Sequence, residues 1–317
     1  MKRTLSSLIA AAFLAGGLAA APAAPPESLS GRLSLSGAWA LYPMALKWAE
    51  EFQKLHPGVK IDVQAGGAGK GIADALSGMV DVGMVSRNIH PTELEKGAWA
   101  IPVTKDAVVP VMNVRHPLLK EIRARGLKRD EFAGIWIGGT VKTWEAALGK
   151  TGRTEIRVYT RSDACGAAET WAAYLGKRQE DLTGIGVYGD PGLADAVRRD
   201  IMGLGFNNVN FAYDAGSKRP IEGLAVIPLD LDGNGRLDPA ENFYGTRDDL
   251  TAAIADGRYP SPPARELYFV TKGAPAKPVL IAFLKWVLRE GQAFVPETGY
   301  IRLHPDKLAA ELGKLGR

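Results

Sequence analysis

The chain has 317 residues, of which 46% are hydrophobic and 23% charged, and its formal net charge is +4. This composition is typical of a globular protein large enough to bury a core. The modest charge, without a basic run or a basic-aromatic stripe, argues against a nucleic-acid partner.

Residues 1–23 have the pattern of a secretory signal peptide. Lys2 and Arg3 precede an apolar run that ends in Ala21-Pro22-Ala23, which fits a signal-peptidase site. We place the cleavage after Ala23 and expect a periplasmic or secreted protein. No later stretch approaches the ~18 apolar residues of a membrane-spanning helix, so we expect that the mature chain does not span a membrane.

Short β-type runs alternate with amphipathic segments of helical length along the chain. The predicted strands cover residues 32–36, 60–65, 80–86, 107–114 and 155–160, and the predicted helices cover residues 43–56, 72–78, 91–97 and 167–176. The first helix is the clearest, because Met44, Trp48 and Phe52 fall on one side of it. This alternation predicts an α/β fold whose sheet is largely parallel and covered by helices on both faces.

Small and cationic residues follow four of the predicted strands. These loops cover residues 37–40, 66–71, 86–87 and 161–166. In an open α/β sheet such loops lie together at the carboxyl edge, where backbone N–H groups and helix N-termini can hold an anion. Each loop alone could be a tight turn, and the glycine-rich one is neither a P-loop nor a G-x-G-x-x-G motif. The four together predict a ligand site.

Six motifs occur in one order: SGAxxLYPMALKWAEEF, the glycine-rich loop, VDVGMVSR, RSDACGAAETW, GLGF and ARELYFVTKG. This order resembles the phosphate-binding proteins of bacterial ABC importers over nearly the whole mature chain. The resemblance implies a type II periplasmic-binding-protein fold, in which two α/β lobes joined by two crossing strands close on a ligand. The implied lobe one covers residues 24–110 plus 264–317, and lobe two covers residues 111–263.

The resemblance also assigns the ligand contacts. They are Ala38, Trp39, Ala40 and Leu41 in the first loop, Ala68, Gly69, Lys70 and Gly71 in the second, Ser86 and Arg87 in the third, and Arg161, Asp163, Cys165, Gly166 and Ala167 in the fourth. It implies that a monomer captures a small oxyanion, phosphate or a related anion. The implied partners are the membrane subunits of an ABC importer, and the ligand undergoes no chemistry.

Arg161 and Asp163 suit a protonated oxyanion. Arg161 offers a forked donor, and Asp163 accepts only from a ligand oxygen that still carries a proton. The alternative is a structural ion pair at the start of a helix. The loops also depart from the resembled family, because alanines and Trp39 stand where hydroxyl groups are usual, which weakens phosphate binding. Lys70 brings a cation to the second loop.

Two other functions stay open. A relative with the same fold could have lost transport and serve in signalling or as a scaffold, and Trp39 filling a closed cleft would favour it. A thiol-dependent enzyme could use Cys165, the only cysteine of the chain, if a histidine lay within hydrogen-bond reach. We expect a small, weakly polar cleft residue at this position instead of a nucleophile.

Residues 230–241, DLDGNGRLDPAE, fit the EF-hand calcium loop D-x-D-x-N-G-x5-E. The expected ligands are Asp230, Asp232, Asn234, the carbonyl of Arg236, Asp238 and the bidentate Glu241. The alternative is a surface turn rich in Asp and Gly. A single loop without a paired partner predicts a structural ion, which would crosslink an exported chain that cannot form an internal disulfide.

Overall fold

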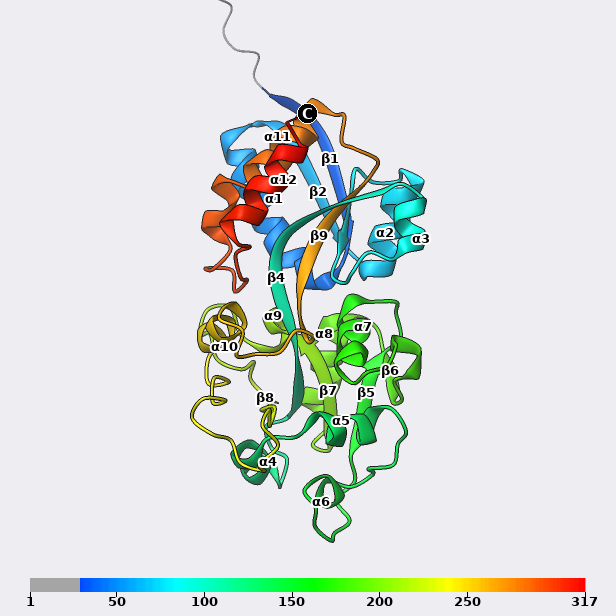
Figure 1. Ribbon diagram of the computed structural model, residues 1–317, viewed down its shortest axis with the longest axis vertical. Helices are drawn as coiled ribbons and strands as arrows, with labels where there is room; N and C mark the ends of the chain where they lie inside the picture. The colour runs from blue at the N-terminus through cyan, green and yellow to red at the C-terminus, as the bar shows by residue number, and fades with distance from the viewer. Residues whose placement is uncertain (1–28, 317) are drawn as a thin grey trace, which may run out of the picture.

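Two α/β lobes lie end to end, and two long strands run between them (Figure 1). The computed structural model describes residues 29–316, so the predicted signal peptide lies outside the described residues. Within residues 29–316, no helix is both long enough and apolar enough to cross a membrane. Lobe one contains the strands at residues 30–37, 58–65 and 82–85, and lobe two contains the strands between residues 157 and 226.

One continuous sheet runs through both lobes in the order β2-β1-β3-β9-β4-β7-β5-β6, and β8 also pairs with β4. Its strands are β1 Ser30–Gly37, β2 Gly58–Ala65, β3 Val82–Val85, β4 Ala98–Asn113, β5 Arg157–Arg161, β6 Ile185–Val187, β7 Gly203–Asn208, β8 Leu224–Val226 and β9 Ala264–Lys272. The mixed α/β architecture with two lobes and two crossing strands confirms the predicted type II fold.

Strand direction follows from the connections. The pairs β1–β2, β1–β3, β5–β6 and β5–β7 are parallel, because helices carry the chain back between them. Every pair that involves β4 or β9 is antiparallel. The prediction of a largely parallel sheet is therefore wrong at the crossing, because β4 and β9 carry the chain between the lobes in opposite directions.

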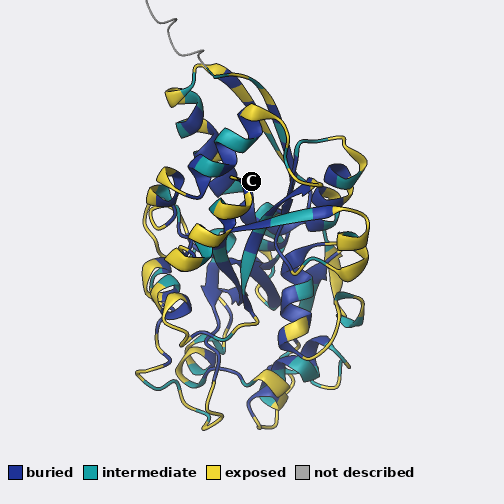
Figure 2. Ribbon diagram, turned by 45° about the horizontal axis from the view of Figure 1, so that its top comes forward, coloured by how far each residue is buried: buried dark blue, intermediate teal, exposed yellow. Residues whose placement is uncertain are grey.

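Helices cover the sheet in each lobe. They are α1 Tyr42–Leu55, α2 Ala68–Ser77, α3 Pro91–Glu95, α4 Leu119–Arg125, α5 Arg129–Trp136, α6 Trp144–Ala147, α7 Gly166–Tyr174, α8 Gly189–Arg199, α9 Val209–Ala212, α10 Arg247–Ala255, α11 Pro278–Val287 and α12 Pro305–Lys314. On α1, Met44, Trp48 and Phe52 are buried as the apolar periodicity predicts. Figure 2 shows the buried strands inside and the exposed residues on the outer faces of the helices.

Each lobe has its own hydrophobic core. The core of lobe one combines residues 33–103 with residues 267–315, whereas the core of lobe two draws mainly on residues 107–264. Aromatic rings form the centre of both, with Phe52 edge-on to Phe283 at 5.2 Å in lobe one and Trp136 edge-on to Trp171 at 5.4 Å in lobe two. Lobe two is thus inserted into the sequence of lobe one.

The crossing consists of β4 and β9, which pair with each other from Ala98↔Lys272 to Ala107↔Ala264. The register is irregular between Pro102 and Thr104, because proline cannot donate a ladder hydrogen bond. Beyond residue 107, β4 pairs with β7 and β8 of lobe two. The 16-residue strand β4 therefore carries the continuous sheet from lobe one into lobe two.

Candidate functional site

The loops of lobe one are held together by backbone hydrogen bonds at the carboxyl ends of β1, β2 and β3. The Gly37 carbonyl accepts from Gly66 N at 2.8 Å and Gly67 N at 3.0 Å, and Ala38 N donates to the Met84 carbonyl at 2.8 Å. Gly37 has a φ of +134°, and a Cβ there would lie 2.3 Å from the Met84 oxygen. Glycine is required because the backbones approach too closely for a side chain.

The fourth predicted loop, residues 161–167, belongs to lobe two and touches the loops of lobe one. Gly69 N, in the first turn of α2, donates to the Ala164 carbonyl at 3.1 Å. A Cβ on Gly166 would lie 2.1 Å from the carbonyl oxygen of Ser86. The structure therefore brings the four predicted loops together, and the lobes meet there backbone to backbone.

The Arg161 side chain is engaged by two carboxylates. It donates to Asp163 through Nε at 2.8 Å and Nη2 at 2.6 Å, and to Asp190 through Nη1 at 2.6 Å. Burial lowers the pKa of Arg161, but the charges of Asp190 and Asp163 outweigh it and raise this pKa. The structural ion pair is thus present, and a contact between Arg161 and a ligand stays a prediction.

Asp190 is a member of this network that the sequence analysis missed. It lies in the first turn of α8, directly after β6, and it is 1% exposed. The signal was available, because a glycine lies close behind a strand end at residues 187–190, as it does in the first, second and fourth predicted loops. The short strand β6 was not predicted, so its loop was not considered.

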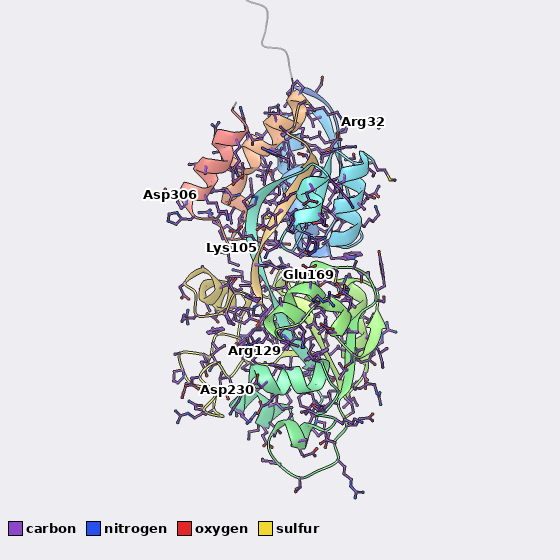
Figure 3. The ribbon with its side chains drawn as sticks, turned by 45° about the vertical axis from the view of Figure 1, so that its right-hand side comes forward. Arg32, Lys105, Arg129, Glu169, Asp230 and Asp306 are labelled. Carbon is purple, nitrogen blue, oxygen red and sulfur yellow. The ribbon has the colours of Figure 1, made fainter. Side chains whose placement is uncertain are left out.

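Arg87 joins the two lobes by an ion pair. Its guanidinium donates to both Glu93 oxygens, at 2.9 and 2.6 Å, and its Nε lies 3.1 Å from Glu169 Oε2 on α7 of lobe two. Figure 3 shows Glu169 and Lys105 at the level where the lobes meet. Burial raises the pKa of Glu169, while Arg87 lowers it. This pair is well placed to stabilise the closed arrangement.

Two cavities lie beside Arg87, between the lobes. One has a volume of about 870 Å³, and its lining includes Gly69, Arg87, Arg161, Ala164 and Cys165. The other has a volume of about 670 Å³, and its lining includes Arg87, Lys105, Glu169, Arg265 and Tyr268. Because Arg87 and Glu169 line both, their ion pair stands between the predicted loops and the crossing strands.

Lys70 forms contacts within lobe one. Its Nζ is in close contact with the carboxylate of Asp74, one helical turn further along α2, and lies 3.2 Å from Ser36 Oγ. The lysine predicted to supply a ligand cation is therefore paired with an acid of its own helix.

Trp39 reaches from lobe one to lobe two. Its ring contacts Phe211 of α9 edge-on at 6.3 Å between centroids, and its Nε1 lies 3.2 Å from the position of a Cβ on Gly189. Trp39 therefore packs against lobe two at the junction of the lobes. The remaining predicted residues are buried and lie at or near the starts of helices: Ala40, Leu41, Ala68, Gly71 and Ala167.

Cys165 caps the N-terminus of α7. Its Sγ accepts a hydrogen bond from Ala168 N at 3.4 Å, as a serine hydroxyl would. Burial raises the pKa of the Cys165 thiol to about 12, although Arg161 lowers it. The thiol is protonated at neutral pH, and no hydrogen bond joins it to a histidine in the described part of the chain. This environment does not support a nucleophile.

The predicted calcium loop brings three carboxylates together. Oxygen atoms of Asp230, Asp232 and Glu241 lie within 4.8 Å of one another. Asp230 and Glu241 are only 4% and 6% exposed. Gly235, at the sharp turn, has a φ of +77°, which is the left-handed conformation that glycine favours.

The other predicted calcium ligands lie on the same loop but engage one another. Asn234 Nδ2 donates to Asp232 Oδ2 at 2.9 Å and to Asp238 Oδ2 at 2.6 Å. Arg236 Nη2 lies 2.7 Å from Asp238 Oδ1. The loop follows β8 and precedes α10, and so it lacks the two flanking helices of an EF-hand sensor.

Comparisons with known proteins agree with this fold. The family model of the PBP superfamily domain matches residues 22–290. The phosphate-binding protein PstS of Pseudomonas aeruginosa is 27% identical over 98% of this chain and 97% of its own, and that of Xylella fastidiosa is 24% identical over 90% and 85%.

Solved structures give the same result. A putative phosphate ABC transporter substrate-binding protein with bound phosphate from Clostridium perfringens superimposes with a TM-score of 0.70 at 20% identity, over 86% of this chain and 100% of that one. An ABC-type phosphate transport receptor from Vibrio cholerae gives 0.62 at 20% identity, over 86% and 100%. With a family model that covers most of its length, the chain belongs to the PBP superfamily.

Proposed function

We propose that this protein is an exported solute-binding protein that captures a small oxyanion, phosphate or a related anion, for an ABC importer. The observation that carries the proposal is the meeting of the four strand-end loops across two lobes, which β4 and β9 connect within residues 29–316. Such an arrangement encloses a ligand by closure of the lobes. The names of the relatives from P. aeruginosa and X. fastidiosa support phosphate.

The site supports capture without chemistry. The backbone N–H groups at the starts of α2 and α7 would provide donors for an anion. Arg161 and Arg87, which are paired with carboxylates in this structure, would add positive charge beside it. The protein would act in the periplasm or outside the cell as a monomer and would present the anion to the membrane subunits of the importer. Residues 1–23 would direct the export.

Calorimetric titration tests this function. The mature protein would be unfolded and refolded to remove carried ligand, then titrated with phosphate, arsenate, sulfate, molybdate and small carboxylates. At least one oxyanion should bind at micromolar concentration or below. Arg161→Ala should abolish this binding, whereas Arg199→Ala should not, because Arg199 is 78% exposed on the outer part of α8. A parent protein that binds none of these anions would exclude the proposed capture.

A second candidate is a transport-inactive relative with a signalling or scaffold role, and the position of Trp39 favours it. Trp39 contacts Phe211 and lies against Gly189 across the lobe junction. The same titration with Trp39→Ala separates the two candidates. Binding by Trp39→Ala alone would indicate a cleft closed by tryptophan, and equal binding by parent and variant would support capture.

We also propose that the loop at residues 230–241 binds Ca²⁺ as a structural ion. The support is the set of three converging carboxylates and the agreement of Asp230, Asp232, Asn234, Arg236, Asp238 and Glu241 with the EF-hand spacing. Hard oxygen ligands of this kind suit calcium.

The calcium proposal is tested by melting with calcium or with a chelator. Calcium at ~100 times its dissociation constant should stabilise the native state by about 2.7 kcal/mol, which is a few degrees of melting temperature in a chain of this size. Glu241→Gln should remove this gain, and Glu222→Gln, an acidic neighbour outside the loop, should keep it. Equal melting temperatures of the parent in both buffers would contradict the proposal.

A further inference from the structure

The two crossing strands carry an oppositely charged pair at the junction of the lobes. Asp106 on β4 lies directly opposite Arg265 on β9, so the two side chains share one face of the sheet. Asp106 is 1% exposed, and the Arg265 side chain is 7% exposed. The nearest ionic distance, from Arg265 Nη2 to Asp106 Oδ2, is 3.8 Å, which is too long for a hydrogen bond.

This buried pair is incompletely hydrogen-bonded. Asp106 Oδ1 accepts from Ala107 N at 2.6 Å, and Arg265 Nη2 donates to Asn208 Oδ1. Within residues 29–316, Asp106 Oδ2 and Arg265 Nε and Nη1 have no hydrogen-bond partner. Buried charged groups without hydrogen-bond partners destabilise a fold. Because Asp106 and Arg265 both keep such unpaired atoms at one place, we infer that these atoms serve a function. Arg161, by contrast, uses three nitrogens on two carboxylates.

The pair is connected to the predicted ligand loops. Asn208, which accepts from Arg265, donates through Nδ2 to Asp190 Oδ1 at 2.5 Å, and Asp190 Oδ2 accepts from Arg161 at 2.6 Å. Arg265 also lines the 670 Å³ cavity, together with Arg87. The unpaired atoms therefore lie between the crossing strands and the loops that meet across the lobes.

A second unpaired donor lies at the same junction. Trp39 Nε1 is buried and has no hydrogen-bond partner in the part of the chain that the structure describes. Two kinds of group thus remain free where the lobes meet, namely N–H donors on Arg265 and Trp39 and an acceptor oxygen on Asp106. A ligand with anionic oxygens and a proton-bearing oxygen would satisfy both kinds and would match the positive charge of Arg265.

We propose that Arg265 and Asp106 are ligand-binding residues, with Arg265 donating to an anionic oxygen of the ligand and Asp106 accepting from a hydroxyl of the same ligand. This inference rests on the proposed capture of an oxyanion and names its class. The ligand is an oxyanion with at least one proton-bearing oxygen, such as hydrogen phosphate or the hydroxyl-bearing phosphate ester glycerol 3-phosphate. Sulfate, which has no proton at neutral pH, would leave Asp106 unpaired.

This arrangement gives Asp106, on a crossing strand, the role that the sequence analysis gave to Asp163, which is to accept from a ligand oxygen that carries a proton. Both oxygens of Asp163 accept from Arg161, at 2.8 and 2.6 Å. Asp106 has an oxygen without such a partner among the described residues. The carboxylate that accepts a hydrogen bond from the protonated oxygen of the ligand is therefore that of Asp106 on β4.

The experiment compares the parent with Arg265→Gln and Asp106→Asn in calorimetric titrations with phosphate, glycerol 3-phosphate and sulfate at pH 8. The parent should bind phosphate or the ester at least tenfold more tightly than sulfate. Arg265→Gln should lose at least tenfold in affinity for the preferred anion. Asp106→Asn should reduce the preference over sulfate at least tenfold, because an amide can donate to an oxyanion that carries no proton.

Arg258→Gln provides a matched control, because Arg258 is paired with Asp256 on the surface and is 46% exposed. It should bind as the parent does. Melting curves show whether each variant folds, and the anion preference of Asp106→Asn is the second readout if Arg265→Gln does not fold. If folded Arg265→Gln and Asp106→Asn keep the parent's anion affinity and its preference over sulfate, this inference is overturned, but the proposed capture of an oxyanion is not. A parent that binds no oxyanion would overturn the proposed function as well.

Discussion

Gly166→Ala should prevent full closure of the lobes. Gly166 begins α7, where lobe two meets the end of β3. A Cβ there would lie 2.1 Å from the Ser86 carbonyl oxygen and 2.3 Å from Ser86 Oγ, whereas ordinary contacts begin at 3.4 Å. The hydroxyl can rotate away, but the carbonyl is part of the backbone. The lobes must therefore separate by roughly 1.3 Å at this point, the difference between 3.4 and 2.1 Å.

The cost of this clash falls on the closed state alone, because opening separates Gly166 from Ser86. Overpacking of a well-packed contact costs about 1–3 kcal/mol, and a ligand that requires closure should lose affinity by the same free energy, about 5- to 150-fold. The assays are calorimetric titration with the anion that binds the parent and small-angle X-ray scattering, which should report a larger radius of gyration for the variant with ligand.

The control is Gly313→Ala on α12, where a Cβ would meet nothing within 4 Å. It should leave both closure and affinity unchanged. If Gly166→Ala closes and binds as the parent does, the contact between Ser86 and Gly166 does not limit closure, and the reasoning is refuted.

Three further predictions concern single groups. Cys165→Ser should retain anion binding, and the parent thiol, whose pKa burial raises to about 12, should react with a disulfide reagent at pH 8 far more slowly than a free cysteine; an equal rate would contradict its burial. Burial raises the pKa of Asp106 to about 7, above the ~3.9 of an unfolded aspartate, so its contribution to stability is present below pH 4 and lost as the pH rises to 7. Asp106→Asn should flatten this part of the pH dependence of urea unfolding, and an unchanged slope would show that another group causes it. Glu169→Gln should weaken anion affinity by less than about tenfold, as expected for a partly exposed ion pair, and should reduce its dependence on salt; salt titrations that match the parent would show that the Arg87 pair does not support closure.

Local patterns were sufficient to predict an α/β fold, whereas the type II arrangement of two lobes was predicted from the family resemblance. The alternation of strands and helices up to residue 176 and the apolar face of α1 correspond to the elements of the structure. The first half of β4 was missed, because Pro102, Lys105 and Asp106 interrupt its apolar pattern. These residues lie at the crossing, where the strand serves two lobes and is not a simple core strand.

The site was predictable in its loops but not in its pairings. The positions after β1, β2, β3 and β5 follow from the general position of ligand loops in α/β sheets. The pairing of Arg161 with Asp190 and of Arg265 with Asn208 joins residues 29 and 57 positions apart, and no local spacing encodes such contacts. Lys70 and Asp74, at i and i+4 on α2, could have been recognised as a helical pair from the sequence.

The position of β9 in the sheet has a consequence for synthesis of the chain. β9 lies between β3 and β4, yet it follows them by more than 150 residues. While the ribosome produces the chain, lobe two can complete most of its core before β9 is made. Lobe one, although its synthesis begins earlier, still has β3 and β4 without β9 between them at that stage. The last fifty or so residues bring β9, α11 and α12, so the core of lobe one is completed last. Synthesis of lobe one thus begins first, but lobe two is the first for which nearly all of the core residues are available.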